Sequence, residues 1–326
     1  MADPIVIERL LDTSPEETFA LLTEPERLRR WQAISAAVDL RVGGDYRLTV
    51  SPGNVASGTV LELDPGRRVV FSWGWVGSDD VPPGSSTLLV ELEPEGEQTR
   101  VRFTHSGLDE IWAARHNQGW QHYGDRLVAA VGEANEIDPW NLVPEEPDHL
   151  NIAEATWAIC RHFLAFLTAE HKDRPTPCAD FTTHQLVEHL RGSMVNIGAM
   201  AGATVDETIE STTAEDFVAV AVEAALAAWR HRGLDGEVPF GVRTAPATVP
   251  AGILSLEFLV HAWDIAQTLG MNLEVPEVIG AYVLDIARTT IRDDNRGPDN
   301  GFGPALDPVG DDPMAQLIAF TGRKMS

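Results

Sequence analysis

Hydrophobic and polar residues alternate along the first third of the chain, which is the pattern of half-buried β-strands. Runs rich in β-branched and aromatic residues recur there, separated by turn signals such as Gly43-Gly44 and Pro65-Gly66. These runs cover residues 4–11, 39–50, 56–66, 67–76, 85–96 and 98–107. The pattern predicts an antiparallel sheet built from successive hairpins.

Two helices are expected around these strands. Residues 14–31 begin with Ser14 as N-cap and carry Glu17 three residues later, which predicts a capping box. Residues 108–130 place apolar and aromatic residues near every fourth position, which predicts a long helix with one apolar face. A curved sheet around a long C-terminal helix buries both apolar faces. We therefore expect an α+β domain.

The second half of the chain has helical periodicity instead. Predicted helices cover residues 151–171, 176–202, 213–233, 250–270, 276–291 and 314–323. Thr182 and Gln185 predict a capping box, while Gly233 and Gly270 mark helix ends. This pattern predicts an all-α bundle.

A short acidic segment separates the two patterns. Residues 133–147 contain three prolines and several acidic residues, as is typical of a linker. We expect an α+β domain at 1–134, a linker at 135–147 and an all-α domain at 148–326.

Composition narrows the possible partners and compartment. The chain has 326 residues, 44% of them hydrophobic, and a formal net charge of −26. Such a charge argues against nucleic acid and anionic membranes as partners, because both require a positive surface. No membrane-spanning run or secretion signal is evident, and two cysteines, Cys160 and Cys178, cannot form a disulfide framework. We expect a cytoplasmic protein.

The segment "LSLEFLVHAWDIAQTLG" carries the candidate chemistry. Glu257, His261 and Asp264 lie on one stripe of an otherwise apolar helix, where burying them is costly without compensation. His189 lies on the inward stripe of another predicted helix. His189, Glu257 and His261 make a three-ligand set with an open fourth position, the pattern of a catalytic zinc site, and Asp264 is placed to orient a ligand imidazole. Alternatively, the Glu257–His261 pair is an ordinary helical pair and His189 a satisfied core residue.

Aromatic residues are concentrated in the first half. Trp31, Trp73, Trp75, Trp112 and Trp120 occur there, together with His116, which shares a predicted helix face with Trp120. They either line a cavity for a hydrophobic small molecule or fill the core, and the pattern alone favours core.

Residues 5 to about 130 resemble a START-like (SRPBCC) branch, the homologues of the activator of the ninety-kilodalton heat-shock ATPase. The resemblance rests on "SPEETFALLTEPERLRRW", "VGGDYRL", "GTVLELDPGRRVVFSWGW" and "VRFTHSGL". It implies a helix-grip cup around an apolar cavity, in a family whose members bind hydrophobic ligands or act as cyclases and dehydratases.

Residues from about 150 onward resemble the DinB-like family, in particular the metal-binding domain of mycothiol-dependent maleylpyruvate isomerase. The resemblance rests on "RPTPCADFTTHQLVEHL", "EFLVHAWDIAQTLG" and "FGPALDPVGDDPMAQLIAFTGR". It implies a four-helix core and zinc ligation by His189, Glu257 and His261.

Three functions remain open from the sequence. The first is a divalent-metal enzyme, a transferase or isomerase, that uses a small thiol such as mycothiol on a small apolar electrophile. The second is a non-catalytic protein that binds a hydrophobic molecule in the cup and whose metal site is structural or vestigial. The third is a scaffold in which neither site holds a ligand.

Overall fold

A computed structural model describes residues 2–132, 136–178, 181–206, 208, 211–297 and 302–324. Contacts divide the chain into an N-terminal unit, Met1–Glu136, and a C-terminal unit, Ile137–Ser326. The predicted domain boundary at residues 134 and 135 lies outside the described residues.

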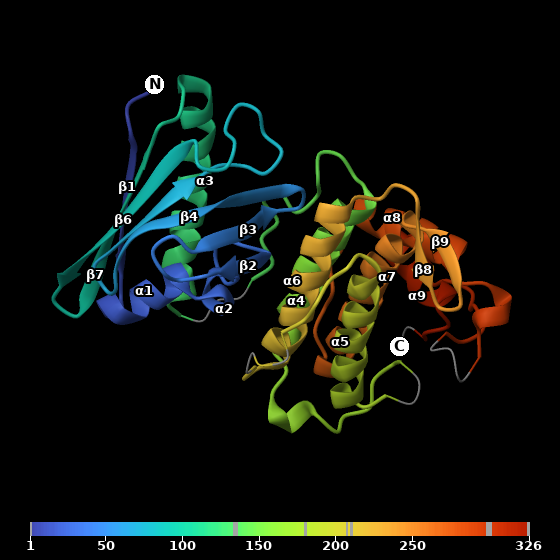
Figure 1. The fold of residues 1–326 in the computed structure, drawn as a ribbon. Coiled ribbons are helices and arrows are strands. Elements are labelled where there is room, and N and C mark those ends of the chain that lie inside the picture. The colour runs from blue at the N-terminus through green and yellow to red at the C-terminus, as the bar shows by residue number, and fades with distance from the viewer. Residues whose placement is uncertain are drawn as a thin grey trace. The chain divides into compact units, whose positions relative to one another are not determined.

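One antiparallel sheet of seven strands forms the described part of the N-terminal unit, in the order β1-β7-β6-β5-β4-β3-β2 (Figure 1). Its elements are β1 (Ile5–Leu11), α1 (Pro15–Thr23), α2 (Pro25–Leu28), β2 (Ser35–Val38), β3 (Asp45–Ser51), β4 (Asn54–Asp64), β5 (Arg68–Trp73), β6 (Ser86–Glu95), β7 (Gln98–Ser106) and α3 (Glu110–Ala130). The long helix α3 lies against the sheet, as the α+β pattern predicts.

Irregular pairing in β3 and β4 accompanies the curvature of this sheet. The register shifts between Val60 and Glu62, and again between Thr49 and Ser51. Such bulges bend a strand and increase its local twist. The bent sheet buries one apolar cluster against α3, and this cluster is the core of the unit.

Gly58 in β4 is a position where the sheet leaves no space for a side chain. A Cβ there would lie 2.0 Å from the carbonyl oxygen of Ser72. We expect Gly58→Ala to lower the free energy of unfolding by about 1–3 kcal/mol, because the backbone must shift to relieve the overlap. Gly192 in helix α5, where a Cβ would meet nothing within 4 Å, provides the control. Urea unfolding of Gly58→Ala that matches the wild type contradicts this prediction.

The start of α1 differs in detail from the prediction. Ser14 accepts a hydrogen bond from the backbone N–H of Glu17, which is half of the expected capping box. The Glu17 carboxylate pairs with Arg27 at 2.6 Å instead. The helix predicted over residues 14–31 is divided into α1 and α2, and the short strand β2 was not predicted.

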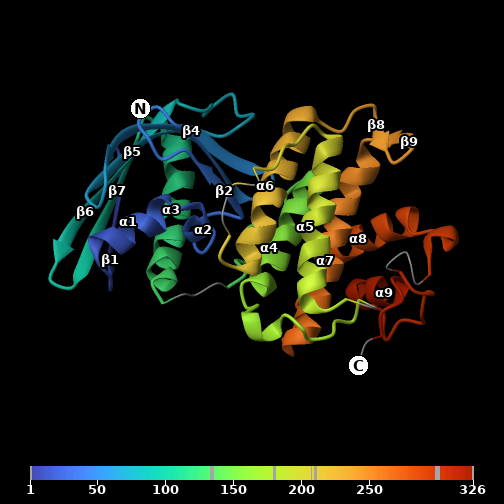
Figure 2. The ribbon, with the colours of Figure 1, turned by 60° about the horizontal axis from the view of Figure 1, so that its bottom comes forward.

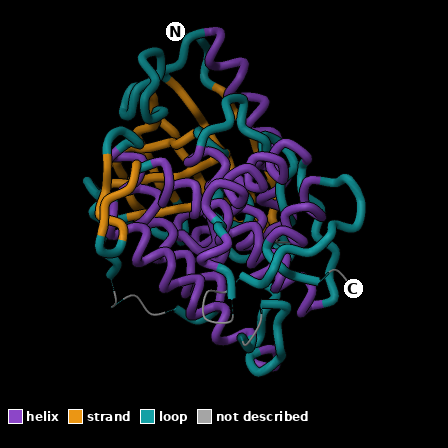
Figure 3. Tube along the Cα trace, turned by 90° about the vertical axis from the view of Figure 1, so that its right-hand side faces the viewer, coloured by secondary structure: helices purple, strands orange, loops and turns teal. Residues whose placement is uncertain are grey.

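Helices form most of the C-terminal unit, and Figure 2 shows α4 to α7 running alongside one another. Its elements are α4 (His149–Leu164), η1 (Ala169–His171), α5 (Thr183–Met200), α6 (Ala214–Arg232), β8 (Glu237–Phe240), β9 (Arg243–Pro246), α7 (Thr248–Leu269), α8 (Glu277–Thr290), η2 (Asp293–Asn295) and α9 (Pro313–Phe320). Helix α4 packs on α7, α5 packs on both α6 and α7, and α8 packs on α9. The hairpin of β8 and β9 was not predicted; the rest of the described part of this unit is helix and loop (Figure 3).

Helix ends follow local chemistry. The capping box of Thr182 and Gln185 is present at the start of α5, and Gly270 ends α7 in the left-handed conformation. Helix α7 begins two residues before the predicted start at Pro250. A proline is tolerated in the first helical turn, because the N–H groups there have no partner within the helix. Helix α4 ends at Leu164, before the predicted end at residue 171, and Phe166 beyond it is 44% exposed.

Helix α7 is the core helix of the unit. By length and composition it is long and apolar enough to cross a membrane, although Glu257, His261 and Asp264 interrupt its apolar sequence. Within the structure, 83% of its most apolar window is buried. A core helix passes the same length and composition test, and burial by neighbouring helices accounts for its apolar character.

Candidate metal centre and aromatic cup

Two packed helices position the candidate metal ligands. Helix α7 carries Glu257 and His261 one turn apart, and α5 carries His189. Because α5 packs on α7, the three side chains meet between these helices.

The distances within this group suit a single cation. The Nε2 atoms of His189 and His261 lie 3.3 and 3.7 Å from Oε2 of Glu257. One ligand atom from each residue lies within 4.8 Å of the others. Neighbouring ligands of a tetrahedral zinc ion with bonds of about 2.1 Å are about 3.4 Å apart. The three side chains therefore need only small movements to share one ion.

The Glu257 carboxylate has an unsatisfied oxygen. Its Oε2 atom is buried and has no hydrogen-bond partner among the described residues. A buried polar atom without a partner is costly, and a carboxylate is more costly than a neutral group. A cation between the imidazoles and this oxygen would remove the cost, so the residues present fit a divalent metal.

The charge state of Glu257 also favours metal binding. Burial alone would raise the pKa of Glu257, but the adjacent imidazoles of His189 and His261 outweigh it and lower the pKa to about 2. The same contact with Glu257 raises the pKa of His189 against the effect of burial. Glu257 is therefore an anion at neutral pH, as a metal ligand must be.

Asp264 and Arg323 fix the orientation of the His261 ring. Nδ1 of His261 lies 2.9 Å from Oδ2 of Asp264. The Nε and Nη2 atoms of Arg323 donate hydrogen bonds to Oδ1 and Oδ2 of Asp264, at 2.8 Å each. Asp264 is 0% exposed and Arg323 5%. Because Asp264 accepts from Nδ1, the Nε2 lone pair of His261 is directed to the metal position.

The sequence predicted that Asp264 orients a ligand imidazole, but it did not predict the contact of Arg323 with Asp264. Arg323 is 59 residues from Asp264 and lies just after α9, in the "FTGR" segment. No helical spacing connects the two residues. The local signal is limited to a basic residue three positions after the apolar run "LIAF".

A second group of potential ligands lies nearby. Cys178, His261 and Asp264 also bring ligand atoms within 4.8 Å of one another. The Arg323 guanidinium already neutralises Asp264 there. A second cation beside it would be repelled, so the His189–Glu257–His261 group is the better metal site.

Exposure identifies the accessible side of the centre. The side chain of His189 is 38% exposed, whereas those of Glu257 and His261 are 14% and 6% exposed. The Phe181 ring lies 5.3 Å from the His189 ring, between centroids. A small molecule would reach the metal position beside His189 and contact Phe181.

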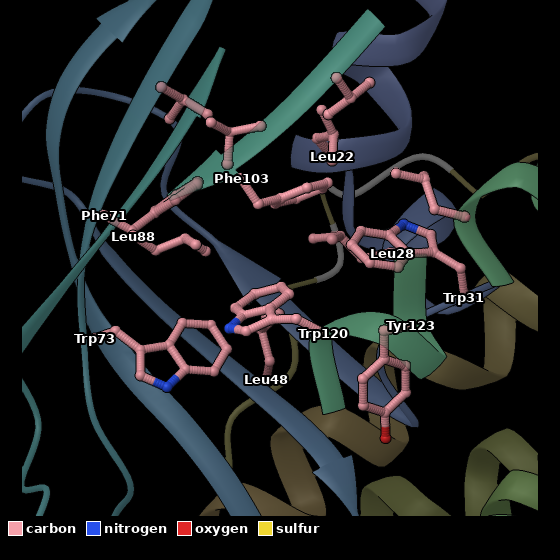
Figure 4. Packing of buried hydrophobic residues seen from close by; sticks show 14 of the residues in the cluster. Leu22, Leu28, Trp31, Leu48, Phe71, Trp73, Leu88, Phe103, Trp120 and Tyr123 are labelled. Atoms are coloured by element: carbon pink, nitrogen blue, oxygen red, sulfur yellow. The ribbon is translucent and has the colours of Figure 1, made fainter. Parts of the chain in front are cut away.

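The aromatic cup of the N-terminal unit is nearly filled by its own side chains (Figure 4). Trp31, Trp73 and Trp120 are 2%, 3% and 4% exposed and line a void of about 30 Å³. About 10–15 Å³ of such space holds one water molecule, so the void has room for a few waters at most. Trp75 and Trp112, which the sequence also suggested for the cavity, are not among its lining residues.

His116, the remaining predicted cavity residue, does not line the void but joins a buried hydrogen-bond network. The indole N–H of Trp75 donates to Nε2 of His116 at 3.1 Å. The indole N–H of Trp120 donates to Nδ1 of His105 at 3.0 Å. Burial, with a smaller contribution from His116, lowers the pKa of His105 to about 3.

The buried neutral His105 predicts acid sensitivity. An unfolded histidine titrates near pH 6.5, so between about pH 6.5 and 3 the unfolded chain binds a proton that folded His105 does not. The free energy of unfolding should fall as the pH decreases through this window, by up to about 1.4 kcal/mol per unit from this residue. Urea unfolding at pH 7 and pH 5 measures this change in the wild type and in His105→Gln, whose side chain at this position cannot titrate. An equal pH dependence in both proteins would refute the prediction.

Comparison with known proteins identifies the N-terminal domain. Residues 12–132 match the family model "Activator of Hsp90 ATPase homolog 1-like protein". The N-terminal unit therefore contains a domain of this START-like type.

Several individual proteins are similar to parts of the chain. An uncharacterized protein of Mycobacterium tuberculosis, Rv0738, is 29% identical over 167 residues, which are 49% of this chain and 89% of that protein. The crystal structure of CalU16 from Micromonospora echinospora is 30% identical, covers 39% of this chain and 75% of that one, and has a TM-score of 0.34. The Aha1 dimer from Colwellia psychrerythraea is 25% identical, covers 40% and 96%, and has a TM-score of 0.36.

Proposed function

We propose that the C-terminal unit binds one divalent metal ion, zinc, through His189, Glu257 and His261, and uses it in a thiol-dependent reaction. The observation that carries this proposal is the buried Oε2 of Glu257, which has no hydrogen-bond partner among the described residues and lies near two imidazole nitrogens. The resemblance of this half to DinB-like proteins with a four-helix core supports the same ligand set.

The donor set favours zinc among the common divalent ions. Two imidazoles and one carboxylate are borderline ligands, whereas calcium and magnesium prefer sites made of oxygen ligands alone. Three protein ligands leave a fourth tetrahedral position available for a substrate.

The reaction class follows from that open position. A bound zinc ion would lower the pKa of a small thiol such as mycothiol, so that a thiolate is available at neutral pH. Asp264 and Arg323 hold His261 in place, and the largely buried α7 keeps bulk water from the inner side of the centre. Phe181 offers an apolar surface beside His189 for a small electrophile. We propose transfer or isomerisation as the reaction.

Metal analysis combined with turnover tests this function. The purified full chain should contain about one zinc ion, and it should accelerate the reaction of a small thiol with an apolar electrophile. A chelator should abolish the acceleration and added zinc should restore it. If the protein contains the metal but shows no thiol-dependent turnover, the metal site is structural and the proposed enzymatic function is wrong.

A second function, binding of a hydrophobic molecule in the cup, has its own support. The indole Nε1 of Trp73, a wall residue, is buried without a hydrogen-bond partner among the described residues. Gln32, 6% exposed, brings a polar amide to the otherwise mostly apolar lining. A ligand with one hydrogen-bonding group would satisfy such a site. The void must widen first, because about 30 Å³ holds no organic ligand.

Tryptophan fluorescence tests the cup. Binding should shift the emission of the buried tryptophans, and replacing Gln32 by leucine should weaken polar ligands more than purely apolar ones. If no apolar ligand changes the tryptophan emission, this second function is wrong.

A further inference from the structure

A pocket of about 600 Å³ lies in the C-terminal unit, and its lining includes none of the metal-centre residues. The end of α8, the turn that follows it and the end of α9 form its wall. Its volume falls within the range of small-molecule sites, about 300–1,000 Å³.

The charge of this pocket is opposite to that of the protein. Arg288, Arg292 and Arg296 line it, and Asp293 is the only acidic residue among the described residues that line it. The whole chain has 50 acidic residues against 24 Lys and Arg. Arg288 pairs with Asp285 at 3.4 Å, but three guanidinium groups in this lining still make the concave space more positive than the rest of the acidic chain, which favours anions.

Arg296 is held in a fixed orientation. Its Nη1 donates to the carbonyl oxygens of Gly303 and Phe320 at 2.8 Å each, and its guanidinium lies 4.6 Å from the Phe320 ring centroid. The side chain is 10% exposed. These contacts use one end of the guanidinium and fix the direction of the other.

The opposite edge of Arg296 makes no hydrogen bond to the described residues. Its Nε lies 3.9 Å from Asp293 Oδ1, beyond hydrogen-bond distance, and its Nη2 has no hydrogen bond there. Arg323 shows what this edge binds, since its Nε and Nη2 grip the Asp264 carboxylate at 2.8 Å. The same planar fork fits carboxylate and phosphate groups.

We infer that this pocket binds a small anionic molecule through a carboxylate or phosphate group held by the Nε and Nη2 edge of Arg296. Arg288 and Arg292 add positive charge, and Phe320 and Pro304 give the ligand an apolar surface. Asp293, whose side chain is fully exposed, is the competing acceptor that a ligand displaces. This site is independent of the metal centre.

Calorimetric titration of the full chain tests this inference with two probes, inorganic phosphate and benzoate, at low ionic strength. Arg296→Gln should weaken binding by about tenfold or more, because it removes a charged bidentate contact. Asp293→Asn should strengthen binding by removing the competing carboxylate. Arg243→Gln, an exposed residue of β9, makes the same charge change and should leave binding unaltered.

Binding of either probe with this order of affinities supports the inference, and the preferred probe identifies the anion class. His261→Ala should bind both probes like the wild type, since the metal centre is separate. The inference is overturned if neither probe binds, or if binding survives Arg296→Gln and disappears in His261→Ala. Should Arg296→Gln fail to fold, unchanged or weaker binding in Asp293→Asn overturns it as well.

Discussion

Replacing His261 by alanine should leave the purified protein without its metal ion. His261 is the most buried of the three proposed ligands, and its Nε2 lies 3.7 Å from the Glu257 oxygen that lacks a partner. Loss of a direct ligand should weaken binding beyond the about 10–100-fold that loss of a supporting partner costs. Elemental analysis and the shift of the melting temperature on chelation both measure this effect.

His184 provides the matched control for this substitution. It lies on α5 near His189, but its side chain is 62% exposed and, within the described part of the chain, pairs with Glu188 at 3.5 Å. His184→Ala should keep the metal content and the chelator-dependent melting shift of the wild type. Full metal content in His261→Ala would show that the ion, if present, is bound elsewhere.

Arg323→Lys should weaken metal affinity by about 10–100-fold while the metal-free protein stays folded. Lysine keeps the positive charge beside Asp264 but cannot reproduce the two hydrogen bonds of the guanidinium. Asp264 would then hold Nδ1 of His261 less firmly, and the ligand nitrogen would lose its fixed direction. Competition with a chelator of known affinity measures the change.

Arg243→Lys in the exposed strand β9 controls for the arginine-to-lysine change. Melting of the metal-free Arg323→Lys protein separates ligand positioning from general destabilisation. If metal affinity is unchanged while metal-free stability falls, Arg323 has a structural role only.

The strand and helix patterns predicted most elements because burial follows the same periods. Five of the predicted strand runs contain β3 to β7 or overlap them, and the predicted run at residues 4–11 contains β1. The capping box at Thr182 was predicted because its hydrogen bonds are local in sequence. The antiparallel sheet and the helical second half are therefore confirmed.

Features that depend on distant contacts were missed. Strand β2 is only four residues long, and it is defined by pairing with β3 rather than by its own pattern. The β8–β9 hairpin is equally short, and its strands contain Pro239 and Pro246, which argue against strands in a local analysis. The ion pair of Arg323 with Asp264 has no local signature for the same reason.

The site residues illustrate the same limit. The spacing of Glu257 and His261 places them together on any helix, but the approach of His189 depends on how α5 packs against α7. The aromatic residues of the N-terminal unit show the opposite problem. Composition alone did not decide whether these residues line a cavity or fill the core. Their packing in the structure leaves a cavity of about 30 Å³.

X-ray absorption at the zinc edge of the purified full chain tests the central claim most directly. The account predicts a first shell of two imidazole nitrogens and a carboxylate oxygen, with distances of about 2.0–2.2 Å and no protein sulfur. A shell that includes sulfur at about 2.3 Å would place the ion at Cys178 instead. That result, or a protein that binds no zinc at all, would contradict the account.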